Sequence, residues 1–397
     1  MNLQTEPVEP PLRVLVVNPL SSGSKLAVTE ILLGTVFGTD RYIDLILLVY
    51  SNEIPLAEEF KIELRACAFS NCNSIQVSSD LPSLSDADVF TFITNFPNPN
   101  RIDFTNIERE EYFDTLYLIL KIAYNLTTQL PVKELVEHKK KITEKKTHKP
   151  IIVADGLVTL HILSAICKDL PPDIVFCPSP VPVAAIFVLA DYLKVETRKF
   201  NHVYAWAADD EVFHFEIEKP LILDDTMEVT GKCGKELVGN EMLETFNFDY
   251  LQLNDAWLKT ELVEKVTSFL EKNPYGSIYR ASEMVKTLSS IWQSRKKPGH
   301  KVYVNVGVIS DGSLGTSKGY PCVLPVIFEG DSWSVNKYFE RDSFLLQEIN
   351  RINKTTKAHR EKLIPYCKKF LEDNVIQQNL MATEEEATTI SIVSTNF

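Results

Sequence analysis

The chain has 397 residues, of which 45% are hydrophobic and 24% are charged, as is typical of a soluble globular protein of about two domains. The 41 lysines and arginines are outnumbered by 54 aspartates and glutamates, so the net charge of −13 argues against nucleic acid or an anionic membrane as a partner. No apolar run approaches the roughly 18 residues that span a bilayer, and the polar first twelve residues predict no signal peptide. Seven scattered cysteines without CxxC pairs are typical of reduced cytoplasmic thiols and predict no metal site.

In the first half of the chain, short apolar runs alternate with helix-like segments. Residues 1–12 are rich in Pro and Glu and predict a loose arm. Buried strands are expected in the runs LRVLVVNP, IDLILLVY, VFTFIT and PIIVADG, and a long helix is expected over 110–130. Strands that alternate with helices predict a parallel sheet with crossover helices, and therefore an α/β domain.

The second half of the chain has a different pattern. VYAWAADDEVFHFEI predicts a hairpin, and the runs VYVNVGVISDGSLG and CVLPVIFEGDSW predict antiparallel strands. Helices are expected over 256–272, 279–294 and 344–372, and the polar tail over 381–397 is expected to be disordered. This pattern predicts an α+β domain after the parallel one, with a cleft at the carboxyl ends of the parallel strands.

Several of these stretches resemble the cytosolic-type malate dehydrogenase family, within the lactate/malate dehydrogenase superfamily. The match is carried in chain order by LLGTVFGTDRYIDLILLVY, FKIELRACAF, VYAWAADDE, DAWLKTELVEKV and VNVGVISDGSLG…PCVLPVIFEGDSW, and it is closest to the divergent type 1B branch. The resemblance implies a Rossmann-type domain over 13–158 and a C-terminal domain over 159–372, between a flexible arm over 1–12 and a flexible tail over 373–397. It also implies NAD as the cofactor, a homodimer and a cytoplasmic protein.

The turn after the first strand lacks the glycines with which this family holds the pyrophosphate of NAD. The first glycine position falls on Pro19, which has no N–H to donate, and the second falls near Ser22, beside Gly23. Ser22 and Gly23 are candidates for contact with the cofactor, and the alternative is an ordinary turn with serine as the helix N-cap. The acidic residue expected at the ribose falls on Val49. Two contacts with NAD that the resemblance implies are therefore not retained.

The family's catalytic positions are also replaced. The histidine that accepts the hydroxyl proton falls on Asp209, its aspartate partner falls on Val181, and a substrate-binding arginine falls on Ala184. The substrate-binding asparagine of the fourth strand falls on Asp155, a further candidate for cofactor contact or a helix cap. His214 is a candidate for a rebuilt base near Asp209, and the alternative is a histidine on a half-exposed strand.

The loop after the third predicted strand normally brings arginines to the carboxylates of the substrate. Its first arginine position falls on Asn98, so Arg101 is a displaced candidate ligand or a surface residue. The small hydroxyl residue of the C-terminal domain falls on Gly276 or Ser277. His161 follows the fourth strand on an apolar helix, where it is interpreted as a packed side chain.

The sequence therefore predicts a malate dehydrogenase-like protein that has lost hydride transfer and persists as a dimeric binding or scaffold protein, with a small molecule as a ligand. The alternative is an NAD-dependent oxidoreductase that interconverts malate and oxaloacetate, or acts on a related 2-hydroxy acid, through a rebuilt site. A weaker alternative is a component of a larger assembly that docks through the basic run Lys139–Lys146 or the C-terminal tail.

Overall fold

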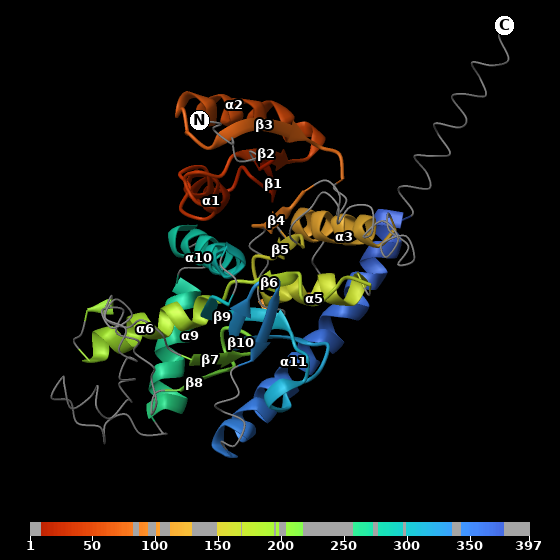
Figure 1. The fold of residues 1–397 in the computed structure, drawn as a ribbon. Coiled ribbons are helices and arrows are strands. Elements are labelled where there is room, and N and C mark those ends of the chain that lie inside the picture. The colour runs from red at the N-terminus through yellow and green to blue at the C-terminus, as the bar shows by residue number, and fades with distance from the viewer. Residues whose placement is uncertain are drawn as a thin grey trace, which may run out of the picture.

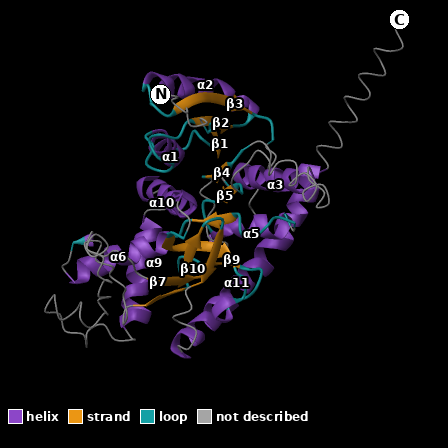
Figure 2. Ribbon diagram, in the orientation of Figure 1, coloured by secondary structure: helices purple, strands orange, loops and turns teal. Residues whose placement is uncertain are grey.

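The computed structural model describes residues 9–81, 87–93, 101–103, 112–128, 149–167, 169–193, 196–197, 204–216, 257–272, 277–296, 299–335 and 343–376. One continuous sheet of eleven strands runs through this part of the chain, with helices on both of its faces (Figures 1 and 2). None of the helices in the described ranges is long and apolar enough to cross a membrane.

Six parallel strands form the N-terminal part of the sheet, in the spatial order β3-β2-β1-β4-β5-β6. These strands are β1 (Leu12–Val17), β2 (Ile43–Leu48), β3 (Cys72–Ser78), β4 (Val89–Phe92), β5 (Ile151–Val153) and β6 (Val175–Cys177). This order is the one expected of a Rossmann-type domain, which confirms the predicted α/β fold. β1, β2, β4 and β5 come from the four apolar runs of the sequence, because a strand covered on both faces is apolar along its length. β3 and β6 are absent from the prediction.

Helices connect the parallel strands and cover both faces of the sheet (Figure 1). The connecting helices are α1 (Ser22–Leu32), α2 (Ile54–Ala66), α3 (Phe113–Thr128) and α5 (Leu157–Ile166), and α6 (Pro180–Leu193) follows the last parallel strand. α3 lies within the segment in which a long helix is expected. The expected domain boundary between residues 158 and 159 falls inside α5, and β6 continues the parallel order after it.

The second half of the chain adds antiparallel strands to the same sheet. They are β7 (Tyr204–Ala207), β8 (Phe213–Glu216), β9 (Lys301–Ile309), β10 (Pro321–Glu329) and β11 (Ser332–Val335). β9 pairs with β6 on one side and β10 on the other, β10 pairs in turn with β7 and β11, and β7 and β8 form the expected hairpin. The α/β part is therefore joined edge to edge with the predicted α+β part.

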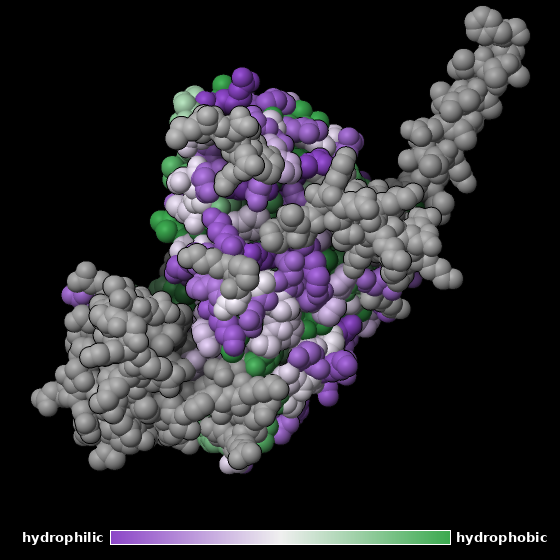
Figure 3. All heavy atoms as spheres, in the orientation of Figure 1, coloured by the Kyte–Doolittle hydropathy of each residue, from purple (hydrophilic) through white to green (hydrophobic). Residues whose placement is uncertain are grey.

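Long helices complete the second half. α9 (Val263–Lys272) follows a π-helical turn at Leu258–Leu262, α10 (Ser277–Lys296) packs on α1, and α11 (Ser343–Phe370) ends in a π-helical turn at Leu371–Ile376. α11 runs along α5 (Figure 1), and its apolar side chains share one buried cluster with those of α3 and α5. The face of the molecule shown in Figure 3 is mostly hydrophilic where it is not drawn grey, in keeping with the acidic composition.

Gly307 makes the junction between the parallel and antiparallel strands tight. It pairs with Cys177 across β9 and β6, and a Cβ at this position would lie 2.1 Å from Sγ of Cys177 and 3.1 Å from Cδ2 of Leu157. Any side chain larger than hydrogen therefore pushes β9 away from β6.

We expect Gly307→Ala to lower the free energy of unfolding by about 1–3 kcal/mol, because overpacking of a buried site forces the backbone to shift. Urea titration followed by circular dichroism measures this change. Gly156→Ala is the matched control: a Cβ there meets nothing within 4 Å, and its φ of −175° is open to any residue. Equal midpoints for the two variants would contradict the close approach of β9 to β6.

Candidate functional site

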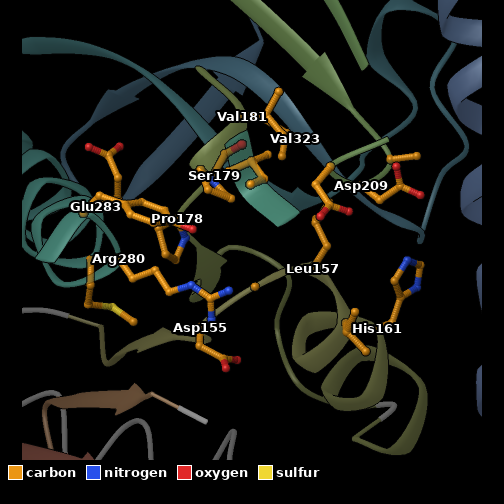
Figure 4. Close-up of a pocket in the computed structure, with 18 of the residues that line it drawn as sticks. Asp155, Leu157, His161, Pro178, Ser179, Val181, Asp209, Arg280, Glu283 and Val323 are labelled. Atoms are coloured by element: carbon orange, nitrogen blue, oxygen red, sulfur yellow. The ribbon is translucent and has the colours of Figure 1, made fainter. Parts of the chain in front are cut away.

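A cavity of about 260 Å³ opens where the parallel and antiparallel parts of the sheet meet. Its wall contains the segments that follow β5, β6 and β7, together with side chains from α10 and α11 (Figure 4). Ligands of open α/β sheets bind outside the carboxyl ends of the strands, so this is the position at which the sequence predicts a cleft.

Asp209 lies in the turn after β7 and is fixed by three contacts. Its Oδ1 accepts hydrogen bonds from the backbone N–H groups of Glu211 at 2.7 Å and Val212 at 2.5 Å. Its Oδ2 lies 3.1 Å from Nε2 of His359, and the two side chains are only 7% and 4% exposed. Burial raises the pKa of Asp209, but His359 and the two backbone N–H groups together outweigh it and hold this pKa below its usual value.

His359 is a cavity residue that the sequence prediction missed. It comes from α11, 150 residues after Asp209, and no short motif connects the two positions. The available signal was the spacing of the buried positions Ile352, Thr356, His359 and Leu363, which share one face of α11. That spacing predicts burial of the histidine, but it does not show which residue it meets.

His161, on α5, is buried as the sequence indicates, and it also lines the cavity. Its side chain is 1% exposed, and neither Nδ1 nor Nε2 has a hydrogen-bond partner within the described part of the chain. Burial, followed by the charges of His359 and Arg360, lowers the pKa of His161 to about 3. Its imidazole is therefore neutral near pH 7, with one N–H donor and one acceptor nitrogen. In Figure 4 it lies on the same side of the cavity as Asp209.

Carboxylates outnumber guanidinium groups among the described residues of the cavity wall. The carboxylates belong to Asp155, Asp209, Asp210 and Glu283, and the guanidinium groups belong to Arg101 and Arg280. Arg101 contacts Asp210 at 3.0 Å and Glu211 at 3.1 Å, and Arg280 extends toward Asp155 in Figure 4. The wall therefore lacks the surplus of positive charge with which a dicarboxylate is bound.

The other predicted catalytic positions offer no ionisable group to the cavity. Val181 and Ala184, in the first turns of α6, are 2% and 1% exposed, and Val181 lines the cavity. His214 lies on β8 with its ring between Trp206, 5.8 Å away, and Phe344, 5.6 Å away, and it is not a lining residue.

Parts of the expected site fall outside the described residues. They are the loop position Asn98, Gly276, the basic run Lys139–Lys146 and the tail after residue 376. Ser277 is the first residue of α10. No group of three or more metal-ligating side chains is found in the described ranges.

The crevice between the ends of β1 and β4, where this fold receives a dinucleotide, is bridged by the protein. Nδ2 of Asn18, after β1, donates a hydrogen bond of 3.1 Å to the carbonyl of Ile93, after β4. Oγ of Ser24 donates to the carbonyl of Asn18 at 2.6 Å, and Ser21 is the N-cap of α1 and accepts from the N–H of Ser24 at 3.1 Å. The side chains of Asn18, Ser21 and Ser24 are therefore engaged in hydrogen bonds within the protein.

The neighbouring positions do not fit NAD either. Pro19 and Gly23 are buried, Ser22 is exposed at the start of α1, and the side chain of Val49 is 4% exposed. A second cavity of about 330 Å³ lies beside Val49 and Tyr50, and the carboxylates that line it are those of Glu53 and Asp114. Pro19 has no N–H to offer a pyrophosphate, and the carboxylates of the second cavity give it an unfavourable charge for one.

Asp155 follows β5 and lines the first cavity. Its Oδ1 accepts a hydrogen bond of 2.6 Å from the hydroxyl of Thr159, in the first turn of α5. The carboxylate is therefore held at the helix start, and the N-cap itself is Gly156.

Comparison with known proteins supports the fold that the geometry shows. No protein-family model matches the sequence. The chain is similar to a curated protein of Arabidopsis thaliana named malate dehydrogenase 3, cytoplasmic, with 22% identity over 347 residues, which are 86% of this chain and 91% of that protein.

Solved structures resemble the chain over nearly its whole length. Malate dehydrogenase from Naegleria fowleri superimposes with a TM-score of 0.65 at 15% identity, covering 91% of this chain and 100% of that one. Trichomonas vaginalis lactate dehydrogenase in complex with NADH and oxamate gives 0.63 at 13% identity, over 90% and 99%. These matches confirm the predicted resemblance to the superfamily, whereas the type 1B branch stays a prediction.

We expect the free energy of unfolding to decrease as the pH is lowered from about 6.5. The unfolded chain protonates His161 near that pH, whereas the folded chain resists protonation of His161 down to about pH 3. Between pH 7.5 and pH 5.0, His161→Leu should therefore lose about 2 kcal/mol less stability than the unchanged protein. Urea titrations at both pH values measure the difference. The exposed His300 provides the control His300→Gln, and equal slopes for both variants would contradict a neutral buried His161.

We expect Asp209→Asn and His359→Gln each to lower the free energy of unfolding by about 2–4 kcal/mol, because each leaves the other buried group without its partner. The double variant should lose about 1–3 kcal/mol less than the sum of the single losses. Lys265 and Glu261, which are 3.8 Å apart and half exposed, form the matched control pair, with a coupling below about 0.5 kcal/mol after alanine substitution. Additive losses at Asp209 and His359 would refute their coupling.

Proposed function

Because this chain has the fold of the lactate and malate dehydrogenases, we propose that it is a catalytically degenerate malate dehydrogenase-like protein. It binds a small molecule in the cavity beside Asp209 and does not transfer hydride. The observation that carries this proposal is the hydrogen bond between Asn18 and Ile93, because it links the ends of β1 and β4 at the point where this fold receives the cofactor's pyrophosphate.

The replaced positions in the cavity support the same proposal. Loss of a general base typically costs about 10²–10⁴ in rate, and the family's base position is held by Asp209, a carboxylate whose pKa lies below its usual value. Val181 and Ala184 bring no charge to the wall. Loss of one partner of a buried charge pair costs about 2–5 kcal/mol of binding, so a dicarboxylate loses affinity as well as reactivity.

We also propose a cytoplasmic homodimer in which the fold serves as a binding or scaffold protein. The relative from Arabidopsis thaliana carries "cytoplasmic" in its name, and the family resemblance implies a dimer. The net charge of −13 disfavours nucleic acid and anionic membranes as partners.

A second function, an NAD-dependent oxidoreductase with a rebuilt site, is favoured by one observation. His359 and Asp209 form a buried histidine–carboxylate pair in the cavity wall, with the carboxylate at the family's histidine position and the histidine on α11. Such a pair is a common general base. The lactate dehydrogenase of the same fold that was solved with NADH and oxamate supports a cofactor for this alternative. A carbonyl substrate with fewer than two carboxylates suits the acidic wall better than oxaloacetate.

We expect purified protein to consume no NADH with oxaloacetate or pyruvate, and calorimetric titration with millimolar NADH to show no binding heat, because the crevice after β1 is bridged and the acidic pocket repels dicarboxylates. Sustained loss of NADH absorbance would support the oxidoreductase instead. The variant His359→Gln then separates a rebuilt site from a contaminating enzyme, since only activity of this chain depends on His359.

A further inference from the structure

The cavity beside Asp209 contains buried polar atoms that have no hydrogen-bond partner among the described residues. We propose that this cavity takes an uncharged small molecule with a hydrocarbon body and a hydroxyl or carbonyl group. The inference rests on the proposed function, because it names the ligand class of the same cavity.

Two buried polar side chains in the cavity wall lack a hydrogen-bond partner among the described residues. They are His161, with both ring nitrogens, and Ser179, whose hydroxyl lies just after β6; the side chains are 1% and 3% exposed. A buried polar group without a partner costs about 1–3 kcal/mol, so a ligand that supplies the partner recovers this free energy. Both side chains are labelled around the cavity in Figure 4.

The neutral state of His161 selects the kind of partner. With a pKa of about 3, its imidazole presents one N–H donor and one acceptor nitrogen at physiological pH. A serine hydroxyl also both donates and accepts. A ligand hydroxyl matches either group in both directions and a carbonyl accepts from either, whereas a carboxylate or an ammonium brings a charge into a buried site.

Charged groups of the wall already have partners of opposite charge within the protein. His359 faces Asp209, Arg101 contacts Asp210 and Glu211, and Lys286 donates to Glu283 at 2.8 Å. An anion entering the cavity meets four carboxylates, and a cation gives up its hydration for carboxylates that are already hydrogen-bonded or ion-paired within the protein. An uncharged molecule avoids both costs.

The rest of the wall is apolar and sets the size of the ligand. Hydrocarbon surface is supplied by Leu157, Val181, Ala208, Leu270, Met284 and Val323. The volume of about 260 Å³ exceeds the roughly 150 Å³ of an apolar cavity that binds benzene. A ring with one polar substituent therefore fits.

Four probes with the same ring test the ligand class: toluene, benzyl alcohol, benzoate and benzylamine. Dissociation constants come from two-dimensional NMR titration of the full-length protein at pH 7.5. We expect benzyl alcohol to bind about 3- to 10-fold more tightly than toluene, which is the gain from one neutral hydrogen bond, and both charged probes to bind more weakly than toluene. Tighter binding of benzoate or benzylamine, or no shift with any probe at millimolar concentration, would overturn the proposal.

Variants locate the polar contact. His161→Leu should reduce the affinity for benzyl alcohol to that for toluene while leaving toluene itself within about twofold, and His161→Gln, which keeps a donor and an acceptor, should retain part of the gain. Ser179→Ala is the companion variant for the second group. An unchanged preference for benzyl alcohol in both His161→Leu and Ser179→Ala would refute the assigned contacts.

The same samples, titrated with NADH and assayed with oxaloacetate, separate this proposal from the proposed function. If NADH is consumed while benzyl alcohol is still the preferred probe, the loss of hydride transfer is refuted and the ligand class stands. If NADH is inert and a charged probe binds best, the ligand class is refuted and the loss of hydride transfer stands.

Discussion

The contact between Asp209 and His359 is the interaction on which the cavity depends. A carboxylate that is 7% exposed is costly to bury unless charge and hydrogen bonds compensate for the lost hydration. His359 reaches Asp209 only if α11 lies along α5, where the apolar side chains of Leu363 and Ile162 share one buried cluster. The position of a helix near the end of the chain and the ionisation of a residue in the middle of the chain are therefore linked, because each stabilises the other.

That linkage gives the cavity its chemical character. With His359 and two backbone N–H groups around it, Asp209 stays ionised, and Asp155, Asp210 and Glu283 add further carboxylates to the wall. The cavity has kept its place at the carboxyl ends of the strands, but its charge is the reverse of what an anionic substrate needs. A binding site can persist in this way because the position of a pocket follows from the fold, whereas its ligand follows from the side chains that line it.

The sequence predicts the fold better than the site, for physical reasons. β1 and β2 are buried on both faces, so their apolar runs are visible in the sequence, whereas β3 (Cys72–Ser78) is a half-exposed edge strand with polar residues and β6 (Val175–Cys177) has only three residues. The replacement at Asp209 follows from the family resemblance, but its partner His359 does not, because α11 meets the turn after β7 only through the tertiary fold. The burial of His161 can be predicted from the apolar sequence of its helix. Its lack of a hydrogen-bond partner among the described residues cannot, because that depends on which side chains surround it in the folded chain.

Both halves of the crevice support the proposal that the chain binds a ligand without transforming it. Near β1, the hydroxyl of Ser24 donates to the carbonyl of Asn18, and the side-chain amide of Asn18 donates to the carbonyl of Ile93 after β4. These two donors are therefore used within the protein and not by a cofactor phosphate. Near β7, the lowered pKa of Asp209 makes its carboxylate a weak base at neutral pH, since the groups that hold it ionised also oppose its taking up a proton. When the charged groups of a site are already paired with one another, they stabilise a charged transition state only weakly. In the proposed complex the free energy of binding comes instead from apolar contact and from hydrogen bonds to His161 and Ser179.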